Sequence, residues 1–158
     1  MSIKEARGVR GVQNKVVFDT SIYIPFINDG IPYSSPVFRN ALDIEKPLIY
    51  MSAVVIEELY AGAFDKVSVK LLDKMYKTFE NIGRLITPEA SDWQNAGKVA
   101  AALGKKSGLE DFFLSGLVND VLISLSARRI GAVVVTRNMK DFVRIKEFVN
   151  FKIYTIEA

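Results

Sequence analysis

The chain has 158 residues, with 21 Lys and Arg against 18 Asp and Glu, and it contains neither histidine nor cysteine. Its net charge of +3 equals the excess within residues 1–15, which hold four basic residues and one acidic residue, so the remainder is balanced. The two missing residue types exclude a Ser-His-Asp triad, a Cys-His pair, a Cys/His zinc site and a disulfide framework, which leaves carboxylates, hydroxyls, Lys, Arg or an oxygen-held metal for any catalysis.

Short β-branched or aromatic runs alternate along the chain with longer segments of helical spacing. In chain order, we expect a strand at 16–18, a helix at 21–28 closed by Asp29-Gly30, a strand at 48–51, helices at 53–64 and 65–82, a strand at 84–86, helices at 88–105 and 109–129, and strands at 132–135 and 151–156. Ser52 is expected to cap the helix that follows it, as is Thr87 with Pro88 at the first helical position. Gly83 and Gly131 are expected to end helices. This alternation predicts an α/β fold with a parallel sheet covered on both faces.

Length and composition indicate one domain. A hydrophobic content of 49% argues against global disorder. No segment reaches the roughly 18–20 uninterrupted apolar residues of a membrane span. We therefore expect a basic arm over 1–15, a single domain over 16–158, and a cytoplasmic protein without a membrane partner.

Polar residues follow two of the predicted strands. Asp19-Thr20-Ser21 follows the strand at 16–18, and Thr136-Arg137-Asn138 with Asp141 follows the strand at 132–135. Ligands bind beyond the carboxyl ends of strands in open parallel sheets, so both clusters are candidates for a site. On its own, Asp19 is equally well explained as a turn residue or helix cap.

Two predicted helices carry carboxylates on apolar faces. On a helical wheel, only apolar or small residues surround Asp120, and an ionised carboxylate there is costly unless it is paired. A hydrogen bond to a neighbouring helix, or a distant Arg, would also satisfy Asp120. Glu57 and Glu58 both border apolar or small residues, and solvated helix surface is the alternative for both; we expect one of them to be exposed.

Carboxylates from three different elements indicate one acidic pocket. Close carboxylates repel one another unless a cation lies among them. All-oxygen ligation favours Mg²⁺ or Mn²⁺ over zinc. Such a site activates water and stabilises charge on a phosphoryl centre without histidine, so hydrolysis of a phosphodiester fits this set of residues.

Four segments together resemble the PIN domain, and within it the VapC-type toxin ribonucleases, across about residues 15–156. They are Val16 to Ser21, Glu58 to Gly62, Val118 to Ile123, and Val135 to Phe142. The resemblance implies a three-layer α/β/α fold with a central, mainly parallel sheet, and a metal-dependent ribonuclease with metal ligands Asp19, Glu58 and Asp120. It selects Glu58 over Glu57, because the family's glutamate precedes Leu-x-x-Gly. It also implies the toxin of a toxin–antitoxin pair, inhibited by an antitoxin protein, and a homodimer.

The last segment departs from the family pattern. Many relatives carry a fourth acid where this chain has Asn138, while Asp141 lies three residues further on and would either compensate or serve as a turn residue. We include both among the catalytic candidates. Thr136 is expected to orient Asp19 or a bound water. Arg137 is placed to meet a phosphate, although a solvated or ion-paired arginine is an equal alternative.

The hydroxyls of Thr20 and Ser21 are also expected to orient Asp19 or a bound water. The basic arm over 1–15 is expected to hold the RNA backbone. Two other functions remain open for the same fold. One is an RNA-processing nuclease without an antitoxin, and the other is a non-catalytic module that binds RNA or protein. A phosphoryl-aspartate enzyme is disfavoured, because Asp19 lacks a second aspartate two residues on.

Overall fold

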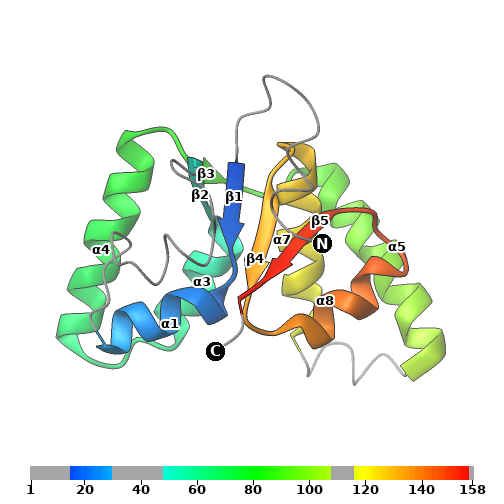
Figure 1. Cartoon of the computed structure of the whole chain (residues 1–158), viewed down its shortest axis with the longest axis horizontal. Helices are drawn as coiled ribbons and strands as arrows, with labels where there is room; N and C mark the ends of the chain where they lie inside the picture. The colour runs from blue at the N-terminus through cyan, green and yellow to red at the C-terminus, as the bar shows by residue number, and fades with distance from the viewer. Residues whose placement is uncertain (1–14, 30–47, 108–115, 157–158) are drawn as a thin grey trace.

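The computed structural model describes residues 15–29, 48–107 and 116–156 (Figure 1). The expected basic arm lies outside the described residues, except Lys15, which begins the first strand. The expected helix end at Gly30 and the first part of the helix expected at 109–129 also lie outside them.

Five strands form one sheet, and every pairing between them is parallel. The strands are β1 (Lys15–Phe18), β2 (Leu48–Ser52), β3 (Leu85–Ile86), β4 (Val133–Thr136) and β5 (Lys152–Thr155). Their order is β3-β2-β1-β4-β5. The chain builds the sheet from β1 outward on one side through β2 and β3, and later on the other side through β4 and β5. The border between β1 and β4 is therefore the topological switch point, where α/β folds bind ligands.

Helices pack on both sides of this sheet, which confirms the three-layer α/β/α expectation (Figure 1). They are α1 (Thr20–Asp29), α3 (Ala53–Ala61), α4 (Lys66–Asn81), α5 (Ala90–Ser107), α7 (Leu117–Arg129) and α8 (Met139–Lys146). In Figure 1, α1 and α4 lie to the left of the strands, and α5, α7 and α8 to the right. None of the described helices is both long enough and apolar enough to span a bilayer.

The central strands are apolar because their side chains lie in the core of the domain. Val16, Val17, Val134 and Val135 are fully buried, as expected for parallel strands covered on both faces. Helix α7 is buried almost all round and packs most extensively against α5. A helix in this position can hold a polar side chain in a fixed place away from bulk water.

Several helix ends lie where the sequence predicted them. The Ser52 hydroxyl accepts a hydrogen bond of 3.2 Å from the Val54 N–H and caps α3. Gly83 and Gly131 follow α4 and α7 with φ of 68° and 72°, a left-handed conformation that glycine adopts without strain. The expectation at Thr87 and Pro88 is wrong, because α5 begins only at Ala90.

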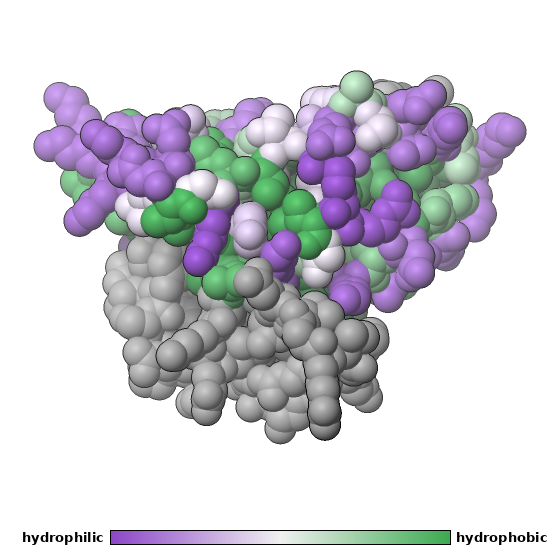
Figure 2. Space-filling view, turned by 90° about the horizontal axis from the view of Figure 1, so that it is seen from above, coloured by the Kyte–Doolittle hydropathy of each residue, from purple (hydrophilic) through white to green (hydrophobic). Residues whose placement is uncertain are grey.

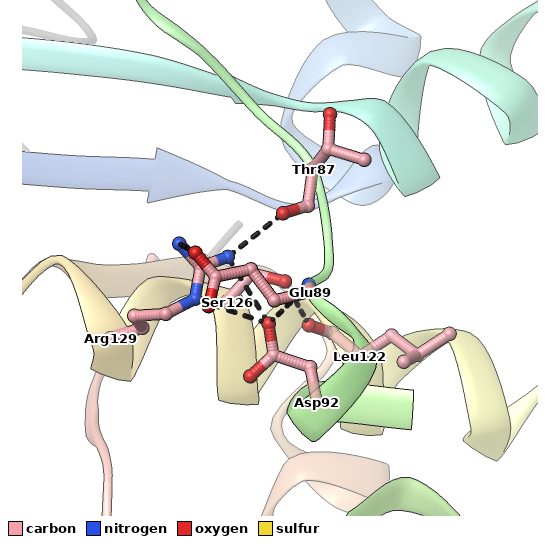
Figure 3. A network of polar contacts seen from close by, with 6 residues as sticks. All are labelled: Thr87, Glu89, Asp92, Leu122, Ser126 and Arg129. Carbon is pink, nitrogen blue, oxygen red and sulfur yellow. Dashed lines mark hydrogen bonds and ion pairs between the residues drawn. The ribbon is translucent and has the colours of Figure 1, made fainter. Parts of the chain in front are cut away.

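A network of polar contacts explains the later start of α5 (Figure 3). The Asp92 carboxylate reaches back and accepts a hydrogen bond of 2.9 Å from the Glu89 N–H. It also pairs with the Arg129 guanidinium, at 3.1 Å from Nη2, while Nη2 donates to the Thr87 carbonyl at 2.8 Å. Thr87 is thus held by the end of α7 instead of capping α5. Arg129, to which the sequence assigned no role, joins the two helices.

A helix that the sequence analysis did not predict, α8, follows β4 directly. Its buried residues are Phe142 and Ile145, one turn apart. This short apolar stripe packs α8 beside α7. Asp141 therefore lies in the first turn of a helix and not in a separate turn, and its part in the site stays a prediction.

Candidate functional site

Asp19 lies at the carboxyl end of β1, at the switch point of the sheet, and its side chain is buried. Its N–H donates to the Val135 carbonyl at 3.0 Å and so extends the pairing of β1 with β4. Oδ1 accepts hydrogen bonds from the N–H of Ser21, at 2.9 Å, and from its hydroxyl. Oδ2 accepts one of 2.6 Å from the Thr136 hydroxyl. Both carboxylate oxygens are therefore fixed in direction.

Opposing effects act on the ionisation of Asp19. Burial raises the pKa of its carboxyl above the ordinary value, while the hydrogen bonds from Ser21, Thr136 and the Ile22 N–H act to lower it. The net direction is upward. Ser21 and Thr136 thus hold the carboxylate in the way expected from the sequence.

Glu58 lies in the middle of α3 and is half-buried, whereas its neighbour Glu57 is exposed. The Thr20 hydroxyl, at the start of α1, donates a hydrogen bond of 2.8 Å to Glu58 Oε1. Thr20 therefore contacts Glu58 and not Asp19, which was one of the two groups, with a bound water, that the sequence suggested for it. Because Thr20 directly follows Asp19, this bond joins the glutamate on α3 to the end of β1.

Asp120 lies in the first turn of α7, is half-buried, and lies near enough to the other acids for their charges to act on it. Burial is the largest effect and the negative charges of Asp19, Glu58 and Asp141 add to it, so that the pKa of Asp120 rises to about 8. Within the described ranges, its carboxylate accepts no hydrogen bond and forms no ion pair. Among the described residues, Asp120 therefore has neither the hydrogen bond nor the distant arginine that would satisfy it. The charges of three other carboxylates, those of Asp19, Glu58 and Asp141, act on it instead.

The residues after β4 are arranged around the same edge. The N–H of Asn138 donates to the Thr136 hydroxyl at 2.9 Å, and the N–H of Arg137 donates to the Ser21 hydroxyl at 2.9 Å. Both residues are exposed. Of the two candidates for a fourth acidic position, Asp141 is half-buried and contributes to the field at Asp120, while Asn138 is exposed at the start of α8.

The donor set fits a hard divalent cation, since it offers carboxylate oxygens with no basic partner at Asp120. Among residues 15–29, 48–107 and 116–156, no three acidic side chains already surround a single metal position. Mutual repulsion keeps uncompensated carboxylates apart, so bringing Asp120 up to Asp19 and Glu58 would require a cation and rotation of the Asp120 side chain, which no described residue holds by a hydrogen bond.

A pocket of about 350 Å³ lies beside the acids. Its polar lining residues include Thr20, Glu58, Asp65 and Ser68, and its apolar lining residues are Ile24, Ile27, Leu59, Ala63 and Phe64. Phe64 is 93% exposed and Ile24 is 46% exposed. The sequence analysis missed this apolar wall. Its only signal is Phe64, an aromatic residue beyond the last turn of α3.

Comparisons with known proteins agree on the fold. The PIN domain model matches residues 16–147. Crystallised VapBC2 from Rickettsia felis, bound to a DNA fragment from its promoter, is 22% identical, with a TM-score of 0.60 over 90% of this chain and 99% of that chain. DNA-bound VapBC from Salmonella typhimurium is 21% identical, with a TM-score of 0.62 over 90% and 98%. VapBC-1 from nontypeable Haemophilus influenzae is 19% identical, with 0.58 over 89% and 97%. No curated protein matches the chain.

Proposed function

This chain belongs to the PIN domain family, a family of nucleases, and on that premise we propose that it is a Mg²⁺- or Mn²⁺-dependent endoribonuclease and the toxin of a toxin–antitoxin pair. The observation that carries the proposal is the carboxylate of Asp120, which has no hydrogen-bond or ion-pair partner among the described residues and whose pKa is raised to about 8 by burial and by the charges of Asp19, Glu58 and Asp141. A half-buried acid among other acids is stable in its charged form only beside a cation.

Asp19, Glu58 and Asp120 would hold the metal, with Asp141 as the fourth acid. A divalent cation bound there would activate water and neutralise the charge that develops on the phosphoryl group. The protein's own contribution is orientation. Ser21 and Thr136 fix the two oxygens of Asp19, and Thr20 fixes one oxygen of Glu58. Fixed ligands remove much of the ordering cost that binding would otherwise carry.

The substrate would be single-stranded RNA, cut to leave 5′-phosphate and 3′-hydroxyl ends. Arg137 is exposed next to the acids, where a guanidinium can bind two phosphate oxygens. The exposed amide of Asn138 would contact the same strand. In this proposal, the basic arm over 1–15 strengthens the hold on the RNA, and residues 16–158 form the single catalytic domain.

An antitoxin partner is supported by the pocket beside the acids. Its wall presents Ile24 and Phe64 to solvent, although burying such side chains is favourable by about 1.5–3 kcal/mol each. An apolar segment of a partner protein would fill this pocket and lie next to Glu58. By family resemblance, we also propose a homodimer and a cytoplasmic location.

The experiment is RNA cleavage by the purified wild type and by Asp19→Asn and Asp120→Asn, with Mg²⁺ and with EDTA. The proposal predicts cleavage only by the wild type with Mg²⁺, and the two variants, purified identically, control for contaminating nuclease. Full activity of both variants would exclude the acidic pocket as the site.

A growth assay distinguishes a toxin from a processing nuclease that has no antitoxin. If the chain is a toxin, inducing the wild type arrests growth while inducing Asp120→Asn does not. Normal growth on induction of an active nuclease would contradict the toxin assignment and leave the nuclease assignment intact.

A further inference from the structure

Helix α4 carries four lysines in one line. Lys66, Lys70, Lys74 and Lys77 are separated by four, four and three residues, which places them along one side of the helix. All four are exposed. The opposite side of α4 holds its buried residues, Leu72, Met75 and Phe79. The lysine line therefore faces outward along the whole length of the helix.

These lysines have no carboxylate partners in the part of the chain that the structure describes. The ion pairs found there join Lys106 to Glu147, and Arg129 to Glu89 and Asp92. The acid best placed for the lysines is Asp73, within one turn of two of them, but it accepts a hydrogen bond of 2.6 Å from the Tyr60 hydroxyl instead. As far as the described residues go, the four positive charges have no ion-pair partner and are open to an external anion.

Tyr60 remains a hydrogen-bond donor across the physiological range. Burial, followed by the hydrogen bond to Asp73 and the charge of that carboxylate, raises its pKa to about 12. Asp73 is therefore held between α3 and α4 by a neutral phenol. This contact engages one oxygen of the carboxylate, and in the described ranges no ion pair joins Asp73 to a lysine.

The first turn of α4 borders the pocket beside the acids. Asp65 and Ser68 line this pocket together with Thr20 and Glu58, and Lys66 lies between Asp65 and Ser68 in sequence. Figure 1 shows α4 at the left edge of the molecule, with α1 between its lower end and the strands. Viewed from above, hydrophilic side chains gather at that same edge (Figure 2). A strand leaving the acids through the pocket would therefore reach α4.

Resting on the proposed function, we propose that the lysine line of α4 binds the sugar-phosphate backbone of single-stranded RNA beyond the carboxylates of Asp19, Glu58 and Asp120. Lysines four residues apart rise about 6 Å along a helix, close to the spacing of successive phosphates, and the line from Lys66 to Lys77 spans about 16 Å. Lysine is depleted from the cores of protein–protein interfaces, whereas phosphate contacts account for most non-specific nucleic-acid affinity. The line therefore fits RNA better than a protein partner.

The test compares two double variants that each remove two exposed helical lysines. Lys70→Gln/Lys74→Gln alters the line, and Lys98→Gln/Lys105→Gln alters α5 as the matched control. Binding of fluorescein-labelled single-stranded RNA, about 20 nucleotides long, is measured by anisotropy in EDTA over a range of NaCl concentrations. Each phosphate contact contributes a slope of about 0.7 in log K against log salt, so the line variant should lose about 1.4 and the control much less.

A second RNA, only about two nucleotides long, adds a length criterion, since its single phosphodiester cannot contact two lysines that lie about 6 Å apart along the helix. The line variant should bind it as the control does. Equal slopes for the two double variants on the long RNA would overturn the inference while leaving the nuclease proposal standing. A wild type that cleaves no RNA and shows no salt-dependent binding would overturn both.

Discussion

The hydroxyl of Thr136 donates a hydrogen bond of 2.6 Å to Oδ2 of Asp19, across 117 residues of sequence. The two residues meet because β1 and β4 are parallel neighbours, so their carboxyl ends share one edge of the sheet. Through this bond, a residue at the end of β4 sets the direction of a carboxylate at the end of β1. The candidate site is thus a product of the strand order as much as of the acids themselves.

Replacing Thr136 by valine tests this bond. Thr136→Val keeps the shape but leaves a buried carboxylate oxygen without its donor, so the free energy of unfolding should fall by about 1–3 kcal/mol. Mn²⁺ affinity should fall as well, because Asp19 loses its fixed direction. Denaturant unfolding and calorimetric titration measure the two effects. Thr136→Ser retains the hydroxyl and should restore both, and a serine variant no better than valine would show that the hydrogen bond is unimportant.

The adjacent glutamates of α3 provide a matched pair. Glu58→Gln should lower RNA cleavage with Mg²⁺ by about 100-fold or more, since losing even an outer-shell partner of a metal costs 10–100-fold. Glu57→Gln should cleave within about twofold of the wild type, because Glu57 is exposed and contacts no group of the site. The initial rates of RNA cleavage by the two variants and the wild type measure both effects. Equal losses at the two positions would mean that Glu58 is not a ligand.

Asp120 predicts a pH dependence in metal-free protein. An ordinary aspartate ionises near 3.8, whereas folded Asp120 retains its proton to about 8. Between these values the folded state binds more protons than the unfolded state, so the free energy of unfolding falls as the pH rises. Asp120→Asn should remove this fall and be more stable than the wild type at pH 8, by up to several kcal/mol.

Urea unfolding in EDTA from about pH 4 to pH 8 measures this effect. The two proteins should be closest in stability at the acidic end, where the unfolded aspartate begins to take up the proton that folded Asp120 already holds. Adding Mn²⁺ at the upper end should stabilise the wild type and not the variant. An Asp120→Asn profile that simply parallels the wild type would contradict the raised pKa.

The network at Arg129 should support stability without taking part in chemistry. Arg129→Met leaves the buried Asp92 carboxylate unpaired, and breaking such a pair costs up to about 3–5 kcal/mol. Asp120 lies at the other end of α7, so cleavage per folded molecule should stay near wild type. Thermal unfolding and rate measurements at low temperature test both points.

Two further variants separate the ion pair from general damage to the helix end. Glu89→Gln removes only a solvent-exposed partner and should change the free energy of unfolding by less than about 1 kcal/mol. Adding Asp92→Asn to Arg129→Met should recover part of the lost stability, because no unpaired charge is then buried. A double variant less stable than Arg129→Met would refute the ion-pair explanation.

Local signals in the sequence predicted much of the fold. Ser52 and the glycines after α4 and α7 act over a few residues, and their roles are confirmed. Pro88 suggested an early helix start, but a distant residue, Arg129, binds the Thr87 carbonyl and overrides that preference. The helix α8 was missed because its apolar stripe is only two residues, too short for helical periodicity to be recognised.

The sequence predicted which residues belong to the candidate site, but it did not predict which of them contact one another. Asp120 stood out because an apolar helix face gave it no local partner, and the structure supplies none among the described residues. The bond from Thr20 to Glu58 spans 38 residues and depends on how α1 packs against α3, which no spacing in the sequence encodes. The same holds for the pocket wall at Phe64.

The most direct test of the acidic pocket is calorimetric titration of the wild type with Mn²⁺ at pH 7, in buffers of different ionisation enthalpy. Because the pKa of Asp120 is about 8 without metal, this carboxyl is mostly protonated at that pH and must lose its proton when the cation binds. We predict Mn²⁺ binding accompanied by proton release, and loss of that release in Asp120→Asn. The absence of binding at millimolar Mn²⁺, or binding with the same proton release in Asp120→Asn, would contradict the account.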